Sequence, residues 1–539
     1  MFPRSKTRRV LARAGALSAA VACLSAMLPV SPAAAAATIN GAGSTWSYIA
    51  VNQWQADVAR QGIPVNFNAN GSTAGRVFYY QDQSDFSVSE IPFQAAYRDS
   101  TGTVTTNEIA LAAHRPYAYL PIVAGGTSFM YHLDVNGSRV TNLRLSAPTL
   151  AKIFTGVIKT WNDPAVTADN GGRVLPPIKV VPVIRSDGSG TSAQFTAYMA
   201  NQTPTIWTAF CQKVGINLNP CPATSLYPPF DGSVAQQYSD GVAAFVSSPS
   251  NNGAITFVEY GYAKQRGFPV ASVLNKAGFY TQPTALNVAI ALLQARINPD
   301  RTQLLGGVYN NPDPRTYPVS SYSYMIVPTT TAKPFSTDKG NTLGRFILYF
   351  LCVGQTKAAQ LGYSPLPKNL VQIGFDAEKL IPGAPAPPPI DQCANPTITG
   401  AFNLNNAPPP APGDKQGTPL PGAPQGPTGG NAGSGNGITN TGNAGNAGNA
   451  GNTGGTKAAT ATTATTVANG LGGGRTADSV AANPGELLSA SGPVTLPGKQ
   501  DPMPLGLYVL AGAFVLLIVF APPTVAVAMR SRERTRRSG

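Results

Sequence analysis

The stretch RSDGSGTS, which begins at Arg185, combines a fixed positive charge, a carboxylate and several small residues ahead of a segment with a helical pattern. Arginine presents planar N–H donors that suit the edge of an oxyanion, and Asp187 is close enough in sequence to hold that guanidinium in place. The first backbone N–H groups of a helix have no partner within the helix, and the helix dipole favours an anion there. The stretch therefore predicts a site that binds a small tetrahedral oxyanion without consuming it.

Two other turns share this design, GAGSTW at 41–46 and NGSTAGR at 70–76. Each follows a strand-like run and precedes a helical pattern, so each would direct free N–H groups and a hydroxyl at whatever lies before the helix. A single turn of this kind is typical of ordinary helix capping, and the Arg185–Asp187 pair by itself is compatible with a surface ion pair of little energetic value. Three such turns in one chain favour an anion site.

The usual signs of an enzyme are missing from the sequence. His114 and His132 are the only histidines, and neither stands in a metal-ligand spacing. A P-loop and a GxSxG serine elbow are also absent from the folded part, although the 24 acidic residues leave paired carboxylates possible. We expect no catalytic residues, no metal and no cofactor.

The elements that must position these turns form an α/β pattern. Strand-like runs such as IKVVPVI, AITFV and SYMIV alternate with helical segments, which favours largely parallel sheets. In the segment that begins at Thr45, a helical face is predicted from the spacing of apolar side chains, namely Trp46, Ile49, Ala50, Trp54 and Val58. The folded part extends roughly over 38–382, which is long for a single core, so two lobes are expected.

The two ends of the chain indicate export and membrane attachment. Residues 1–37 show a basic start, an apolar stretch and a small-residue exit, as a signal peptide does. Residues 504–529 are long and apolar enough for one transmembrane helix. The arginine-rich tail 530–539 then lies in the cytoplasm by the positive-inside rule. Residues 381–503, rich in Pro, Gly, Asn and Thr, are expected to form a disordered stalk. A sortase-type sorting signal is the alternative at this end, but LPxTG is absent.

Charge and cysteine content agree with an exported protein. The signal peptide and the tail contribute much of the formal net charge of +14, so the remaining excess gives no argument for nucleic-acid binding. Removal of the signal peptide would leave four cysteines, an even number that suits disulfides in an oxidising compartment. Pairing of Cys211 with Cys221 and of Cys352 with Cys393 is the simplest of three connectivities, and the sequence does not choose among them. A zinc site is less favoured because CxxC is absent.

Ordered blocks of sequence resemble the phosphate-binding proteins of Pst-type ABC transporters. These blocks are GAGSTW, LSAPTLAKIFTGVIKTWNDPAV at 145–166, RSDGSGTS, GVAAFVSSPSNNGAITFVEYGYAKQ at 241–265 and YPVSSYSYMIVP at 317–328. The resemblance covers nearly all of 38–375 and implies a two-lobe periplasmic-binding-protein type II fold. It places the first part of lobe I at 38–119, lobe II at 120–318 and the return part of lobe I at 319–380, with crossings near Leu120 and Tyr317.

The resemblance also implies roles for individual residues, which match the turns found above. It implies that Asp187 supports the arginine with its carboxylate and that both lobes supply donors to the phosphate. These donors are Thr45, Trp46, Ser72, Arg185, Ser189, Gly190 and Thr191. One position departs from the family pattern, because the run DFSVSE puts Glu90 where the family has an aspartate. A buried acceptor can take the proton that phosphate retains near neutral pH (second pKa of a phosphate ester ~6) and would repel sulfate. Glutamate is longer than aspartate by one methylene group. Either the cleft is adjusted to this length, or the ligand differs from phosphate, or Glu90 faces away from the ligand.

The resemblance thus implies an extracytoplasmic protein, expected to be monomeric, that captures inorganic phosphate between two lobes and delivers it to an ABC permease. It would be anchored in the cell membrane by its C-terminal helix and would bind no nucleic acid. The alternatives are a membrane-tethered phosphate sensor or scavenger that feeds no transporter, a binder of another oxyanion, and a phosphatase-like enzyme on the same scaffold.

Overall fold

The computed structural model describes residues 36–96 and 105–420, all of which belong to one structural unit. The predicted transmembrane helix 504–529 and basic tail 530–539 lie outside the described residues. Nearly all of the predicted signal peptide 1–37 and residues 421–503 of the predicted stalk also lie outside them. Among the helices of the described part, none is both long and apolar enough to cross a bilayer.

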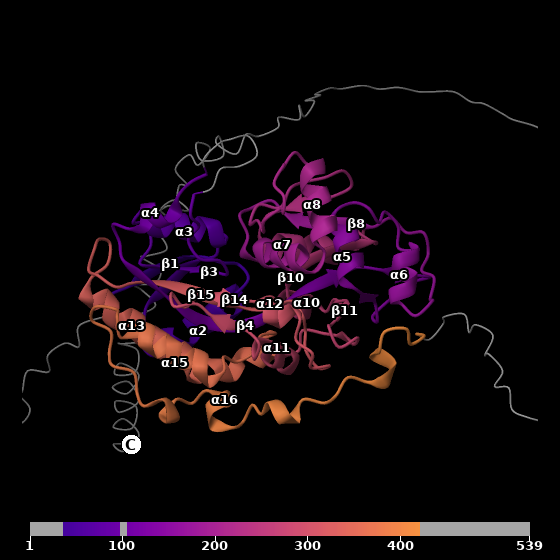
Figure 1. Cartoon of the computed structure of the whole chain (residues 1–539). Helices are drawn as coiled ribbons and strands as arrows, with labels where there is room; N and C mark the ends of the chain where they lie inside the picture. Colours follow the sequence, from indigo (N-terminus) through magenta and orange to yellow (C-terminus); the bar gives the residue numbers. More distant parts are fainter. Residues whose placement is uncertain (1–35, 97–104, 421–539) are drawn as a thin grey trace, which may run out of the picture. The chain divides into compact units, whose positions relative to one another are not determined.

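A mixed eight-stranded sheet runs through the folded part (Figure 1). Its strands, in spatial order, are β2 (Val65–Asn68), β1 (Ile39–Gly43), β3 (Phe86–Ser89), β15 (Ser320–Pro328), β4 (Tyr117–Tyr131), β10 (Ala254–Glu259), β8 (Val181–Arg185) and β9 (Val234–Gln236). Smaller sheets pair β7 (Arg144–Leu145), β11 (Ser272–Leu274) and β12 (Tyr280–Thr281), then β13 (Arg296–Ile297) with β14 (Gln303–Leu304), and β5 (Asp134–Val135) with β6 (Ser138–Arg139).

Two long central strands join the two halves of this sheet. β4 pairs with β15 as far as Gly126 and with β10 from Thr127 onward, and both pairings are antiparallel. The outer pairs β1–β2, β1–β3, β10–β8 and β8–β9 are parallel, as expected, so the prediction of a largely parallel sheet is correct for the outer strands and wrong for the centre. Both central strands are almost completely buried. The sequence of β4 is accordingly mostly apolar, whereas β15 buries three serines among its apolar and aromatic residues. The change of partner falls several residues after the predicted crossing at Leu120.

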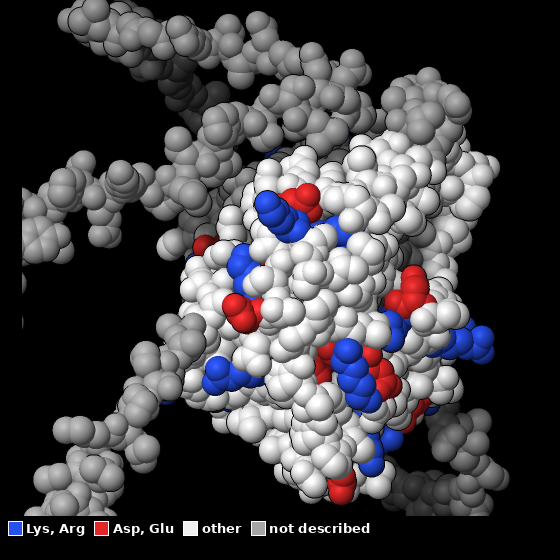
Figure 2. Space-filling view, turned by 90° about the vertical axis from the view of Figure 1, so that its left-hand side faces the viewer, with Lys and Arg blue, Asp and Glu red and all other residues white. Residues whose placement is uncertain are grey.

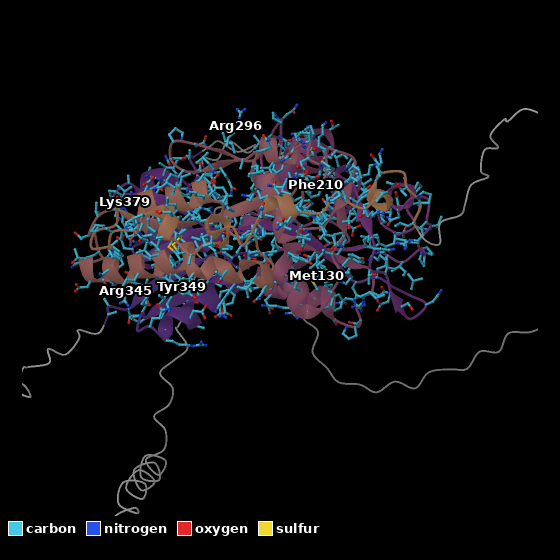
Figure 3. The ribbon with its side chains drawn as sticks, turned by 90° about the horizontal axis from the view of Figure 1, so that it is seen from below. Met130, Phe210, Arg296, Arg345, Tyr349 and Lys379 are labelled. Atoms are coloured by element: carbon cyan, nitrogen blue, oxygen red, sulfur yellow. A yellow bond between two sulfur atoms is a disulfide. The ribbon has the colours of Figure 1, made fainter. Side chains whose placement is uncertain are left out.

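Helices pack on both sides of the sheet and enclose the core (Figure 1). Their bounds are α2 Tyr48–Ala59, α3 Ser72–Tyr80, α4 Glu108–Ala112, α5 Ala147–Phe154, α6 Pro164–Asp169, α7 Gly190–Gln202, α8 Pro204–Lys213, α9 Tyr238–Ser247, α10 Tyr260–Arg266, α11 Ala285–Leu292, α12 Gly306–Tyr309, α13 Thr337–Leu351, α14 Ala358–Leu361, α15 Lys368–Glu378 and α16 Pro396–Thr399. The face predicted for α2 is confirmed, because Ile49, Ala50, Trp54 and Val58 are all buried. Figure 3 views the molecule from below, with Arg345, Tyr349 and Lys379 toward one side and the buried Met130 and Phe210 toward the other.

Residues 381–420, which we call the strap, correct the predicted start of the stalk. The disulfide Cys352–Cys393 joins the strap to the end of α13, and Cys211–Cys221 is also formed, so the simplest pairing is confirmed. Asn395 is fully buried and donates to the carbonyl groups of Leu351 and Leu366. Figure 1 shows the strap crossing the lower side of the molecule toward the second half. The composition predicted disorder because the strap has few large side chains. This prediction is wrong for 381–420, because the strap is held to the domain by its hydrogen bonds and by the disulfide of Cys393.

Candidate functional site

The three predicted turns meet where strands of both halves end. Residues 44–47 connect β1 with α2, Gly71 precedes α3 after β2, and Ser189 caps α7 after β8. The carboxyl ends of parallel strands are where α/β proteins usually bind ligands. The turns are in direct contact, because Gly190 donates its N–H to Ser72 Oγ over 3.0 Å and Thr73 donates its N–H to the carbonyl of Gly188.

Arg185 is the cation of this region and is held in a fixed orientation. Its Nε and Nη2 donate to the two oxygens of Asp187 at 2.7 and 2.5 Å, and the guanidinium is 2% exposed. Asp187 also accepts the backbone N–H of Tyr238 at the start of α9. The pair is therefore buried and braced by a third element, which excludes the alternative of a weak surface ion pair.

The free edge of the Arg185 guanidinium faces hydroxyl groups from both halves. Nη2 donates to Thr45 Oγ1 at 3.1 Å, and Nη1 donates to Ser239 Oγ at 3.2 Å and to Thr191 Oγ1 at 3.5 Å. Thr45 and Ser239 are in turn within 2.9 Å of each other through their hydroxyl groups. A buried cation surrounded by small hydroxyl groups can bind a compact anion through charge-assisted hydrogen bonds.

Glu90, directly after β3, faces the same region. Its Oε2 accepts from Ser72 Oγ at 2.7 Å, and its Oε1 accepts from Ser44 Oγ at 2.5 Å and Ser323 Oγ at 2.7 Å. The side chain is 1% exposed, so the alternative in which Glu90 faces elsewhere is wrong for this structure. A Cβ at Gly190 would lie only 1.9 Å from Glu90 Oε2, which shows how closely this carboxylate approaches the start of α7.

The structure thus brings together all the residues predicted for the site. The Ser189 hydroxyl and the Trp46 ring, however, have structural partners of their own. Ser189 Oγ accepts the N–H of Ser192, so this hydroxyl caps α7. Trp46 donates its N–H to Ser44 Oγ at 3.0 Å, whereas its ring is buried and packs edge-on against Tyr363. The ring fits against the sheet because Gly125 has no side chain, since a Cβ there would lie 2.7 Å from the indole.

Three hydroxyl groups of the site were missed from sequence. Ser44 lies inside the GAGSTW turn and could have been found there. Ser239 is the second residue of α9, directly after Tyr238 with its positive φ. It stands in the run YSDG, which repeats the serine, aspartate and glycine of RSDG at Arg185 and could have been noticed. Ser323 lies inside β15 where the register with β4 shifts, and such an irregularity re-aims a side chain without any local sequence signal.

A further buried carboxyl group lies near the site, at the start of α10. Glu259 is fully buried, and its Oε1 accepts the N–H of Gly261 as a helix cap. Burial raises the pKa of Glu259 well above its usual range, partly offset by the backbone N–H of Gly261. The neighbouring Tyr262 hydroxyl donates to the carbonyl of Thr45, which connects α10 to the first turn.

The histidines and the surface charges have other roles. His114 pairs with Asp82 at the surface, and His132 lies between the carbonyl of Val246 and Asp134. Within residues 36–96 and 105–420, no group of three or more His, Cys, Asp or Glu side chains could hold a metal ion. Figure 2 shows basic and acidic side chains intermixed on the face that it displays, without a large patch of one sign.

Comparison with known proteins defines the class of the chain. A family model described as a PBP superfamily domain matches residues 29–352. The chain is 31% identical to the phosphate-binding protein PstS of Pasteurella multocida (strain Pm70) over 340 residues, which cover 62% of this chain and 88% of that protein. It is 28% identical over 338 residues to the phosphate-binding protein PstS 2 of Mycobacterium tuberculosis (strain ATCC 25618 / H37Rv), covering 61% and 84%. The chain therefore belongs to the PBP superfamily and, within it, to the PstS family.

A solved structure of a high-affinity periplasmic phosphate-binding protein with bound phosphate is 18% identical, with a TM-score of 0.47, and covers 62% of this chain and 92% of that one. Membership of a family of binding proteins confirms the prediction that the chain is not an enzyme.

Proposed function

We propose that this chain is an extracytoplasmic solute-binding protein that captures inorganic phosphate between its two lobes and delivers it to an ABC permease. One observation supports this above all others. The buried guanidinium of Arg185, held by Asp187, is surrounded by hydroxyl groups that come from turns of both halves. A ligand contacting Arg185, Thr45 and Ser72 together would favour the closed arrangement of the lobes.

Glu90 gives this site a means to discriminate between anions. Near neutral pH phosphate carries a proton that it can donate to a carboxylate, whereas sulfate carries none and would be repelled. Glu90 already accepts three hydroxyl hydrogen bonds, so a ligand must either replace some of these donors or add its own. The carboxylate of Glu90 lies directly against the start of α7, where the anion would lie.

The test is a calorimetric titration of residues 38–420 with phosphate and with sulfate, for the unaltered protein and for Glu90→Gln. We expect the unaltered protein to bind phosphate and to reject sulfate. In Glu90→Gln the carboxylate that accepts the phosphate proton is lost, so phosphate affinity should fall. The neutral amide does not repel sulfate and can donate to it, so sulfate affinity should rise. Absence of phosphate binding in the unaltered protein would refute the assignment, and equal affinity for the two anions would refute the role of Glu90.

The remaining residues support a membrane-anchored form of the protein. A signal peptide at 1–37 would export the chain, and a transmembrane helix at 504–529 would anchor it with the binding domain outside the cell. Because the strap belongs to the domain, the flexible part of the stalk would begin after residue 420. Protease treatment of intact cells should release the domain, and the tail 530–539 should remain protected.

An anchored domain could also act without a permease, as a sensor or scavenger. Deletion of the gene should reduce phosphate uptake if the protein feeds a transporter. Unchanged uptake together with altered starvation signalling would favour the sensor instead.

A further inference from the structure

Two buried tyrosines outside the predicted site hold backbone carbonyl groups within it. The hydroxyl of Tyr262 donates to the carbonyl of Thr45 at 2.7 Å, and the hydroxyl of Tyr363 donates to the carbonyl of Trp46 at 2.6 Å. Tyr262 is 4% exposed and Tyr363 is 1% exposed. Two consecutive peptide units of the first turn are therefore fixed by side chains that are distant from them in sequence.

Fixing a carbonyl also fixes an N–H group, because the peptide unit is planar and trans. The carbonyl of Thr45 and the N–H of Trp46 belong to the same unit, so they point in opposite directions. With Tyr262 on the carbonyl side, the N–H of Trp46 is directed to Ser44 Oγ, whose hydroxyl donates to Glu90. This N–H is one of the donors predicted for the anion.

We propose that Tyr262 and Tyr363 are positioning residues. They hold the carbonyl groups of Thr45 and Trp46, so that the N–H groups of the same two peptide units, which belong to Trp46 and Ser47, face the phosphate site. The inference rests on the proposed function for the identity of the anion. Both hydroxyl groups remain donors at physiological pH, because burial raises the pKa of Tyr262 and of Tyr363 well above the usual range.

The contact from Tyr262 links the two halves of the molecule. Tyr262 lies on α10, which follows β10 in the second half, whereas Thr45 follows β1 in the first half. The start of α10 is fixed by Glu259 as its cap and by close contact with the first half, since a Cβ at Gly261 would lie 2.5 Å from the carbonyl of Leu361. Orientation of the first turn would therefore depend on the two halves being together, which couples closure to the presentation of the donor.

The first test needs no ligand. Hydrogen exchange of the Trp46 and Ser47 amides would be measured by NMR in phosphate-free residues 38–420, for the unaltered protein, Tyr262→Phe, Tyr363→Phe and the control Tyr260→Phe. Tyr260 lies on the same helix, and its ring faces the Lys264 ammonium at 5.8 Å. We expect faster exchange of the Trp46 amide in Tyr262→Phe, faster exchange of the Ser47 amide in Tyr363→Phe, and no change of either amide in the control. Unchanged exchange in both variants would overturn the inference.

The second test measures phosphate affinity and thermal stability in the same set. Loss of one hydrogen bond of about 1 kcal/mol corresponds to about a fivefold weaker affinity. We expect this for Tyr262→Phe, together with a smaller rise in melting temperature on addition of phosphate. A purely structural role would lower the melting temperature by the same amount with and without phosphate and leave the phosphate affinity unchanged. That result would overturn the inference. Failure of the unaltered protein to bind phosphate would refute the proposed function, while the exchange result would still decide the positioning.

Discussion

At the scale of single residues, the site depends on the guanidinium of Arg185 and the carboxylate of Glu90, which have different partners. Arg185 is neutralised by Asp187 on one edge and offers its other edge to hydroxyl groups of both halves. Glu90 accepts hydroxyl donors from three separate segments. Burial makes both charges costly unless they are partnered, so each must be part of a defined network.

Replacement of Arg185 by methionine should remove most of the anion affinity. A buried charge-assisted pair of hydrogen bonds contributes about 3 kcal/mol, which corresponds to a loss on the order of 100-fold. Calorimetry of Arg185→Met against Arg266→Met would measure this, because Arg266 forms an ion pair with Asp240 at the surface and should leave affinity unchanged. Stability must be followed as well, since Asp187 would lose its buried partner. Retained affinity would mean that the anion lies elsewhere.

At the scale of elements, helix starts deliver the donors, and the glycine at the start of α7 allows Glu90 to approach. A Cβ on Gly190 would lie 1.9 Å from Glu90 Oε2 and 2.6 Å from Ser72 Oγ. The approach therefore depends on the absence of a side chain, which is a known use of glycine.

The variant Gly190→Ala should displace Glu90 and lower phosphate affinity by about tenfold or more. The new methyl group would collide with Glu90 and Ser72, which are held in place by their hydrogen bond to each other. Gly241→Ala on α9 is the matched control, since the nearest atom to its new Cβ would be Gln236 Cβ of β9, at 3.8 Å. Alanine in a helix is more favourable than glycine by about 1 kcal/mol, so the control should raise the free energy of unfolding slightly. Equal affinity of the two variants in calorimetry would contradict the expected contact.

Helix α15 contains a carboxyl group that should make stability depend on pH. Glu378 is fully buried, and burial raises its pKa to about 8. In the unfolded chain this group titrates near its ordinary value of 4.5, so between these values the native state binds more protons than the unfolded state. The free energy of unfolding should therefore fall as pH rises from about 5 to 8, by on the order of 3 kcal/mol from this group.

Denaturant unfolding of Glu378→Gln across that pH range measures the effect, and this variant should lose the corresponding slope. Asp376→Asn is a suitable control on the same helix. The pKa of Asp376 is lowered, chiefly by its hydrogen bond with Lys379, so its contribution is lost only at lower pH. Identical slopes in Glu378→Gln and the unaltered protein would show that Glu378 ionises in the native state.

At the scale of the whole molecule, the strap ties the end of the folded region to both halves. Cys393 anchors it beside α13, and Arg144 of β7 donates to the carbonyl groups of Gly413 and Thr418 and pairs with Asp414. Arg144 is 5% exposed, so its charge relies on strap residues for partners. The strap is thus a structural part of the domain.

Truncation after residue 380 should destabilise the domain relative to residues 38–420. Loss of a native disulfide typically costs about 2–5 kcal/mol, and the buried Arg144 would lose its hydrogen-bond acceptors. Thermal and denaturant unfolding of the two lengths would measure the difference. The double variant Cys352→Ser with Cys393→Ser in the longer chain separates the disulfide from the remaining strap contacts and should lie between them. Equal stability of both lengths would show that the strap is dispensable.

Local features of the sequence determined the site chemistry and much of the fold. The turns around Thr45, Ser72 and Arg185 could be found because helix starts and strand ends depend on residues a few positions apart. The buried face of α2 could be predicted for the same reason. These local signals are sufficient to indicate an oxyanion site.

Only the tertiary structure decided which distant segments complete that site. Ser239, Ser323 and Tyr262 reach it from elements far along the chain, and nothing in their local sequence shows that these elements meet the first turn. Orientation of Glu90 and attachment of the strap likewise depend on packing between segments. Such contacts arise from how whole elements pack against one another, and no periodicity or motif within a single element records them.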